Sequence, residues 1–233
     1  EDDWLVFCEV NRAFAERTAL EAAEGAVVWL HDYNLWMVPA YLRELRPDLR
    51  IAFFHHTYFP SADVFNVVPW RRQIVGSLLQ CDYVGFHIPR QVENFVDVAR
   101  GVFPLRTAGR QSCAPRFLTY GCAVGLERMT TALDTGTRTV KLGAHPVGLD
   151  IERVRNALAA PKIKELMARL REELNGVMLI LSVERLDYTK GIDVRVRAVG
   201  ELLTDGALPG GDTVLLQVAT PSREGEAGYR RSR

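Results

Sequence analysis

The sequence predicts an α/β fold with a mostly parallel sheet, because short apolar segments alternate along the chain with longer amphipathic ones. The short segments are typical of buried parallel strands and lie at 26–30, 51–54, 82–86, 139–144, 177–183 and 213–218. A second observation supports the same class. Polar residues, above all histidine, follow the strands directly, as they do where an α/β sheet binds a ligand.

Helices are expected between these strands, where apolar residues recur at helical spacing. The pattern predicts helices at 4–23, 35–46, 69–79, 92–99, 150–160, 161–174 and 192–203. Pro69 and Pro161 suit the first turn of a helix, Asp150 suits an N-cap, and Asn175-Gly176 suits a helix end. Residues 105–136 mix Gly, Pro, Thr and Cys and predict either a hairpin or an irregular excursion.

Composition changes near residue 150 and predicts two domains, residues 1–150 and residues 151–233. The second supplies only two predicted strands, which seldom form a stable sheet alone. The chain also starts without methionine, almost directly in a helix. We therefore expect it to be cut short at both ends, with 151–233 as the beginning of a second α/β domain.

Charge and cysteine content exclude several classes of protein. The 29 basic and 29 acidic residues balance, which argues against a general nucleic-acid binder. The four cysteines are scattered, so we expect reduced thiols rather than a disulfide framework or a zinc site. No apolar run approaches the ~20 residues of a membrane span, and the start is unlike a signal peptide. A cytoplasmic location without membrane or nucleic-acid partners is the expectation.

All five histidines follow predicted strands: His31, His55, His56, His87 and His145. Carboxyl ends of parallel strands meet at one edge of a sheet, so these side chains should gather there. Scattered, half-buried structural histidines are the plain alternative. Together with Asp32, the set suggests either a metal centre for hydrolysis or hydrogen bonds to a polyhydroxylated substrate. The spacing matches no zinc motif, and adjacent residues on a strand point to opposite faces.

A second candidate site lies in the turn after the strand at 177–183. Arg185 and Lys190 precede Gly191 and a helix, and such a strand-to-helix turn favours anions. A solvated charged loop beside Glu184 and Asp187 is the alternative. A phosphate held here would lie opposite a sugar bound at the sheet edge that carries the histidines, here called the histidine edge. That combination would suggest sugar-nucleotide chemistry.

Several short motifs of the sequence resemble those of the trehalose-6-phosphate synthase family of retaining glycosyltransferases. They are WLHDYNLW (29–36), IAFFHHTYFP (51–60), PWR (69–71), GFH (85–87), PVG (146–148) and VERLDYTKG (183–191). The resemblance implies a GT-B fold of two facing Rossmann-like domains. Residues 1–150 would be the later part of the acceptor-side domain, and 151–233 the truncated start of the nucleotide-sugar domain. It implies no metal and no cofactor.

Within the family, three motifs resemble the glucosylglycerol-phosphate synthase branch more closely: HDYNLW (31–36), FFHHTYFPSADVFN (53–66) and GFHIPRQVENFV (85–96). Trehalose-type chains usually have a second His where Asn34 stands and one His before Ile-Pro-Phe-Pro. The branch implies glycerol 3-phosphate as acceptor, ADP-glucose as donor and compatible-solute synthesis under salt stress. Three alternatives stay open: a trehalose-6-phosphate synthase, a metal-dependent hydrolase and a non-catalytic sugar-phosphate-binding relative.

The resemblance also implies roles for individual residues. Asp32 would contact the acceptor, and His56 the donor glucose near the reaction centre. Arg185 and Lys190 would hold the nucleotide diphosphate and stabilise its developing charge. Such enzymes retain the anomeric configuration without an obvious protein nucleophile, and the leaving phosphate is thought to help deprotonate the acceptor hydroxyl.

Two further residues complete the predicted site. His87 would bind substrate at the histidine edge, and Arg223 falls where trehalose-type enzymes bind the acceptor phosphate. The family's glycine-rich donor loop and its acidic donor-binding residues would lie outside these 233 residues, so we expect this chain alone to turn over little or nothing. The residues present decide neither the donor base nor the oligomeric state, and a homo-oligomer stays open.

Overall fold

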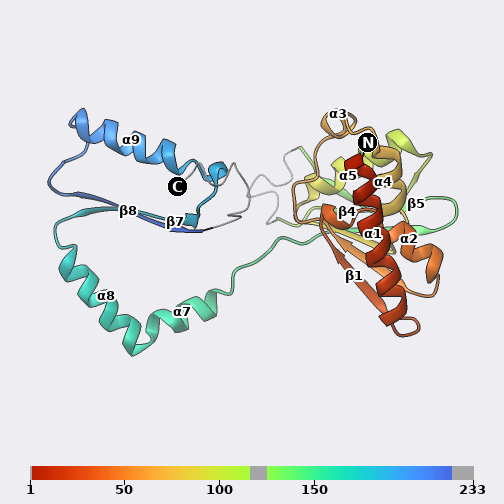
Figure 1. The fold of residues 1–233 in the computed structure, drawn as a ribbon, viewed down its shortest axis with the longest axis horizontal. Helices are drawn as coiled ribbons and strands as arrows, with labels where there is room; N and C mark the ends of the chain where they lie inside the picture. Colours follow the sequence, from red (N-terminus) through yellow and green to blue (C-terminus); the bar gives the residue numbers. More distant parts are fainter. Residues whose placement is uncertain (1, 116–124, 222–233) are drawn as a thin grey trace. The chain divides into compact units, whose positions relative to one another are not determined.

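The structure, a computed structural model, describes residues 2–115 and 125–221. It divides into two compact units, residues 1–148 and 149–233 (Figure 1). That boundary lies two residues before the expected one. Assignment of the first unit to the acceptor and of the second to the nucleotide sugar stays a prediction.

The first unit is built on a six-stranded sheet in the order β1-β2-β3-β6-β5-β4. Its parallel strands are β1 (Val27–His31), β2 (Arg50–Phe54), β3 (Tyr83–Phe86) and β6 (Thr139–Ala144). β5 (Arg128–Asp134) pairs antiparallel with β6 and with β4 (Arg106–Ser112). The mostly parallel α/β sheet is therefore confirmed. Of the two alternatives for 105–136, the hairpin describes β4 and β5.

Helices of this unit pack against one another and on the sheet. α1 (Asp2–Glu21), α2 (Val38–Leu45) and α4 (Arg71–Leu78) lie side by side in Figure 1, and α5 (Pro89–Val102) packs on β3, β5 and β6. The helix expected from Pro69 begins only at Arg71, so Pro69 is not in its first turn. The short α3 (Ala62–Phe65) and the 3₁₀ helix η1 (Tyr33–Leu35) were not predicted, since so few residues show no period.

Strand register separates a packed face of the sheet from the residues that surround the candidate site. Leu30, Phe53, Val84 and Leu142 form one row across the four parallel strands, and all four are buried. The next row, one residue further along each strand, is His31, Phe54, Gly85 and Gly143. Because side chains alternate along a strand, the second row faces the opposite side. The core thus lies on one face, and the histidines lie at the carboxyl edge.

Gly143 leaves room for an aromatic ring that lies along the second face. A Cβ at position 143 would overlap the hydroxyl oxygen of Tyr83. That hydroxyl is hydrogen-bonded to Nε2 of His145, at 2.5 Å. His145 is therefore held by a side chain from the start of β3.

The buried face of α1 differs from the expected one. We expected Val10 and Phe14 on the apolar face, because they are among the apolar residues that recur at helical spacing in 4–23, but they are 47% and 54% exposed, whereas Asn11 is fully buried. The Asn11 amide donates to the carbonyl oxygens of Phe7 and Asn34 and accepts from the Met37 N–H, at 2.9 to 3.0 Å. A satisfied amide can be buried at little cost, and it ties α1 to the segment after β1.

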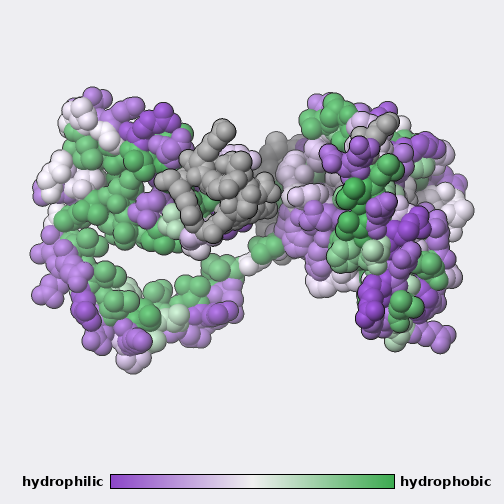
Figure 2. Space-filling view, viewed as in Figure 1, coloured by the Kyte–Doolittle hydropathy of each residue, from purple (hydrophilic) through white to green (hydrophobic). Residues whose placement is uncertain are grey.

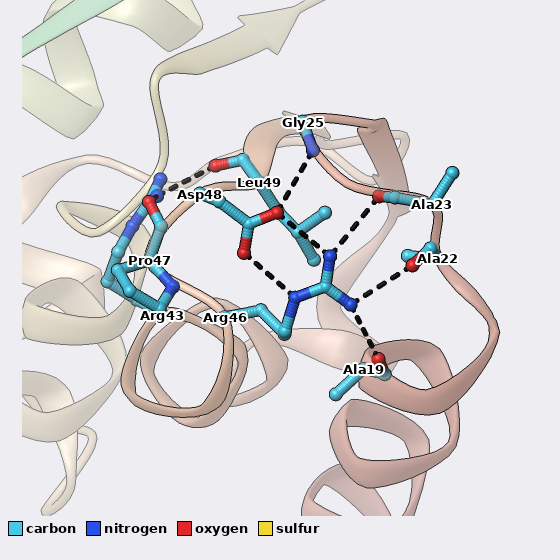
Figure 3. Close-up of polar contacts among 9 residues, drawn as sticks. All are labelled: Ala19, Ala22, Ala23, Gly25, Arg43, Arg46, Pro47, Asp48 and Leu49. Carbon is cyan, nitrogen blue, oxygen red and sulfur yellow. Dashed lines mark hydrogen bonds and ion pairs between the residues drawn. The ribbon is translucent and has the colours of Figure 1, made fainter.

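Arg46 closes the carboxyl end of α1 (Figure 3). Its guanidinium donates to the carbonyl oxygens of Ala19, Ala22 and Ala23, at 2.8 to 3.2 Å. Asp48 accepts two hydrogen bonds from the same guanidinium and one from the Gly25 N–H. The hydrogen bonds from Arg46 hold the pKa of Asp48 well below its usual range. One charged pair therefore satisfies carbonyl groups that a helix end leaves unpaired.

The second unit contains a two-stranded parallel sheet, β7 (Met178–Arg185) and β8 (Thr213–Thr220), joined by η2 (Tyr188–Lys190) and α9 (Ile192–Thr204). α7 (Ile151–Ala159) and α8 (Pro161–Glu173) precede it. The expected N-cap is confirmed, since Asp150 accepts from the Arg153 N–H at 2.9 Å. Figure 2 shows hydrophobic residues over β7 and β8 and along α7 and α8; exposed examples are Leu158, Leu166, Leu170, Leu181 and Val183.

The described residues bear on two exclusions drawn from the sequence. None of their helices is long and apolar enough to cross a membrane. In the same ranges the cysteines Cys8, Cys81 and Cys113 are free thiols, and Cys81 is buried in the core.

The Arg46 contacts predict a specific loss of stability. Lysine keeps the positive charge but lacks the planar guanidinium with its several N–H donors. Arg46→Lys should therefore break most of the hydrogen bonds to the carbonyl oxygens at the helix end. We expect the midpoint Tm of thermal unfolding to fall by about 2 to 4 °C. Arg50→Lys, a matched change at an exposed position, should leave Tm unchanged. Equal Tm values for the two variants would show that the Arg46 contacts contribute no stability.

Candidate active site

Three histidines meet at the carboxyl edge of the first sheet: His31, His56 and His87. His31 Nδ1 and His56 Nε2 share a hydrogen bond of 2.9 Å, and their rings lie with centroids 5.2 Å apart. His87 Nε2 donates to the His56 carbonyl oxygen at 3.0 Å, so its proton is on that nitrogen. Of the five histidines expected to gather at this edge, the structure brings these three together, with His56 at the centre.

Asp32 links the ends of β1 and β2. Its Oδ1 accepts from the His56 N–H (3.2 Å), the Thr57 N–H (3.0 Å) and the Thr57 hydroxyl (2.9 Å). Burial acts to raise the pKa of Asp32, but the hydrogen bonds from Thr57 outweigh it and the pKa is lowered. The carboxylate is thus ionised near neutral pH, and it fixes the turn that carries His56.

The backbone of Asp32 is strained. Its φ is +66° and its ψ is 170°, a region that residues with a Cβ rarely adopt. Such conformations persist where surrounding contacts impose them, often at functional sites. Here the Asp32 N–H donates to the Phe54 carbonyl oxygen at 2.8 Å, while the side chain bonds to the turn after β2.

His55 is buried on the opposite side from the exposed His56, as the alternation of side chains predicts. Its Nδ1 donates to the Thr57 carbonyl oxygen at 2.7 Å, and aromatic rings of Phe59 and Phe86 surround it. Burial lowers the pKa of His55, so its ring is neutral near pH 7. His55 thus packs in the core beside the site.

The structure bears on the metal hypothesis and on the position of His145. Within the two described ranges, no group of three or more His, Cys, Asp or Glu side chains is arranged to hold a metal ion. His31 and His56 bond to each other instead. His145 also lies at the carboxyl edge, where its Nε2 is hydrogen-bonded to the Tyr83 hydroxyl.

In the second unit, the turn that carries Arg185 and Lys190 has a fixed internal structure. Arg185 is the last residue of β7, and Lys190 ends η2. Asp187 accepts from the Thr189 N–H at 3.0 Å and from its hydroxyl at 2.8 Å, which lowers the pKa of Asp187. Gly191, with φ of +60°, then starts α9. Both cations are exposed next to a helix N-terminus, an arrangement that suits an anion.

Arg195 connects this turn to both strands of the second sheet. It donates to Ser182 Oγ on β7 (2.7 Å) and to Gln217 Oε1 on β8 (3.0 Å). It also pairs with Glu184 Oε1 (2.7 Å) and donates to the Lys190 carbonyl oxygen (3.3 Å). Arg195 therefore positions the turn rather than a ligand.

The two groups of site residues lie in separate units. Asp32, His56 and His87 are brought together in the first unit, and Arg185 and Lys190 in the second. Arg223 lies outside the described residues. The roles expected of all six stay predictions.

Sequence reasoning missed three residues that shape the site: Asn11, Thr57 and Arg195. Asn11 gave a weak signal, because it is a polar residue at a core position of a helix. Thr57 and Arg195 gave none, because each acts through partners far away in the sequence.

Comparison with known proteins identifies close relatives. The family model of glycosyltransferase family 20 matches residues 1–233. The chain is 78% identical over 222 residues to a glucosylglycerol-phosphate synthase of Pseudomonas anguilliseptica, covering 95% of this chain and 29% of that protein. It is 42% identical to a glucosylglycerol-phosphate synthase of Synechocystis sp., covering 98% of this chain and 46% of the relative.

Solved structures are similar in fold. A trehalose-6-phosphate synthase studied with bisubstrate glycomimetics has a TM-score of 0.79 at 25% identity. The match covers 100% of this chain and 47% of the chain of that enzyme. A UDP-forming trehalose-phosphate synthase from Burkholderia xenovorans, in complex with glucose-6-phosphate, has a TM-score of 0.75 at 26% identity, covering 100% and 48%. The expected GT-B fold class is confirmed. The chain spans less than half the length of each of these proteins.

The hydrogen bonds to Asp32 predict a pH-dependent contribution to stability. Because the folded pKa is lowered, the contribution is present above the unfolded value of about 4 and is lost as the pH falls below it. At pH 7, Asp32→Asn should therefore lower the free energy of unfolding by about 1 to 3 kcal/mol.

Denaturant titrations at several pH values would measure this effect. The difference between the chain and Asp32→Asn should shrink below pH 4. Asp97→Asn, at an exposed position on α5, is the matched control and should show little change. A difference that stays constant down to acidic pH would contradict the ionised role of Asp32.

Proposed function

Because this chain belongs to glycosyltransferase family 20, we propose that the full-length protein is a retaining glucosyltransferase that makes glucosylglycerol phosphate. It would move glucose from ADP-glucose to sn-glycerol 3-phosphate, in the cytoplasm and for compatible-solute synthesis. The observation that carries the proposal is the 78% identity, over 95% of the chain, to a glucosylglycerol-phosphate synthase.

The histidine edge supports a sugar-binding role for the first unit. Asp32 stays ionised because its Oδ1 accepts three hydrogen bonds, so the carboxylate can also accept one from an acceptor hydroxyl. His56 uses Nε2 for His31, which leaves Nδ1 as the ring nitrogen that can meet a ligand. That nitrogen suits a hydroxyl of the donor glucose, and His87 supports the His56 main chain.

The turn of the second unit supports a role in binding diphosphate. Transfer of glucose leaves negative charge on the departing phosphate, and fixed cations stabilise that charge in the transition state. Arg185 and Lys190 lie on one turn held by Arg195 and Asp187, so little reorganisation would be needed on binding. Arg223 would bind the acceptor phosphate.

A trehalose-6-phosphate synthase is the second candidate, favoured by the similarity to solved enzymes of that type. Acceptor choice by the full-length protein separates the two. We expect turnover with ADP-glucose and glycerol 3-phosphate to exceed turnover with glucose 6-phosphate at least tenfold, about 1.4 kcal/mol of discrimination. UDP-glucose in place of ADP-glucose tests the donor base in the same assay.

Preference for glucose 6-phosphate would assign the protein to the trehalose branch. Stoichiometric zinc or manganese in the purified protein, required for turnover, would instead support the hydrolase hypothesis. A protein that binds sugar phosphates without turnover would be a non-catalytic relative.

Replacement of a cation in the second unit tests for catalysis itself. In the full-length protein, Lys190→Ala should lower kcat by about 10²- to 10³-fold, because transition-state charge loses a fixed partner. Arg185→Ala should act in the same direction. Lys162→Ala, at an exposed position on α8, is the matched control. An unchanged kcat for both site variants would rule out the proposed diphosphate contact.

A further inference from the structure

Thr57, in the exposed turn after β2, gives Asp32 two hydrogen bonds. Its N–H donates to Asp32 Oδ1 at 3.0 Å, and its hydroxyl donates to the same oxygen at 2.9 Å. The His56 N–H adds a third hydrogen bond, at 3.2 Å. The two N–H groups belong to the main chain, so almost any residue at these positions would supply them. The hydroxyl is therefore the part of this contact that requires threonine at position 57.

All three hydrogen bonds end on one oxygen of the Asp32 carboxylate. The two oxygens of a carboxylate offer about four lone-pair sites together, so Oδ1 has little room for another donor. The side chain of Asp32 is nevertheless 22% exposed, so the carboxylate can still meet a ligand. Oδ2 is the oxygen that can accept a further hydrogen bond.

The Thr57 hydroxyl also limits how far the carboxylate can turn. The last torsion of an aspartate side chain is broad, so the direction of an unrestrained carboxylate is poorly defined. Here the main chain holds Oδ1 through two N–H groups, and the hydroxyl holds it through a side chain. Threonine is β-branched and stiff at its first torsion, so its hydroxyl is itself well placed. The hydroxyl thereby helps to fix the direction in which Oδ2 points.

The buried ring of His55 directs the Thr57 hydroxyl toward Asp32. His55 Nδ1 lies 2.7 Å from the Thr57 carbonyl oxygen, which can only accept, so Nδ1 carries a proton. The same nitrogen lies 3.3 Å from the Thr57 hydroxyl oxygen. That oxygen accepts from Nδ1 and keeps its own proton for Asp32 Oδ1. A chain of hydrogen bonds thus runs from the core, through Thr57, to the carboxylate.

We propose that Thr57 is a positioning residue for the acceptor, because its hydroxyl holds Asp32 Oδ1 so that Oδ2 faces the acceptor hydroxyl. The proposal rests on the proposed function, in which Asp32 contacts the acceptor. Thr57 itself would not touch the substrate. The main-chain hydrogen bond that holds His56 remains when the hydroxyl is lost, so the effect should fall on the acceptor and not on the donor.

Two substitutions in the full-length protein separate the hydroxyl from the rest of residue 57. Thr57→Val keeps the branched shape and the N–H but has no hydroxyl, whereas Thr57→Ser keeps the hydroxyl. Thr139→Val, at an exposed position at the start of β6, is the matched control. Steady-state kinetics with glycerol 3-phosphate and ADP-glucose gives kcat and the KM of each substrate.

For Thr57→Val we expect kcat/KM for glycerol 3-phosphate to fall about 10- to 100-fold, the effect of one hydrogen bond to a charged group. The loss should lie mainly in the KM of the acceptor, and the KM of ADP-glucose should stay unchanged. Thr57→Ser should restore the acceptor KM, and Thr139→Val should not alter it. A merely structural role of Thr57 would lower the amount of active protein, and hence kcat alone. That result would overturn the proposal.

A double-mutant cycle of thermal unfolding does not depend on turnover. If the hydroxyl acts through the carboxylate, Thr57→Val should lower the Tm of the chain by about 2 to 4 °C and leave the Tm of Asp32→Ala unchanged. An equal loss in both backgrounds would show that Thr57 acts without Asp32, and would overturn the proposal.

Turnover with glucose 6-phosphate in place of glycerol 3-phosphate would overturn the proposed function instead. The same variants, measured with glucose 6-phosphate, would then decide the role of Thr57.

Discussion

The carboxylate of Asp32 is the interaction on which the candidate site depends. It accepts three hydrogen bonds from the turn after β2 while its own backbone holds a left-handed φ of +66°. The strain is tolerated because these bonds fix the residue from both sides. Through them the turn places His56 against His31, and His87 supports the same main chain. The edge that we propose to bind sugar is therefore held in one arrangement by the protein itself, and such preorganisation would lower the cost of binding.

Much of this arrangement could be predicted from the sequence, because it depends on strand periodicity. Apolar runs at 26–30 and 51–54 correspond to β1 and β2, and the residues directly after a parallel strand lie at its carboxyl edge. Alternation along the strand also separated His55 from His56 correctly. The Asp150 cap was predictable for a similar reason, since a helix N-terminus needs an acceptor within a few residues.

Other features were beyond sequence reasoning, because they depend on packing between distant segments. Asn11 replaces Val10 and Phe14 on the buried face of α1 because a carbonyl oxygen and an N–H from 34–37 happen to meet it there. Arg195 looks like an ordinary helix-surface charge until β7, β8 and η2 surround it. Local pattern carries no information about such meetings.

The ring of Tyr83 above Gly143 has a consequence for how the sequence can vary. Any side chain at 143 would occupy the space of the Tyr83 hydroxyl, and that hydroxyl holds His145. Residue 143, on β6, therefore cannot gain a side chain while Tyr83, on β3, keeps its hydroxyl in that space. A lineage that enlarges residue 143 must first shorten residue 83 and give up the tether on His145. A larger residue at 143 should consequently occur only with a smaller residue at 83.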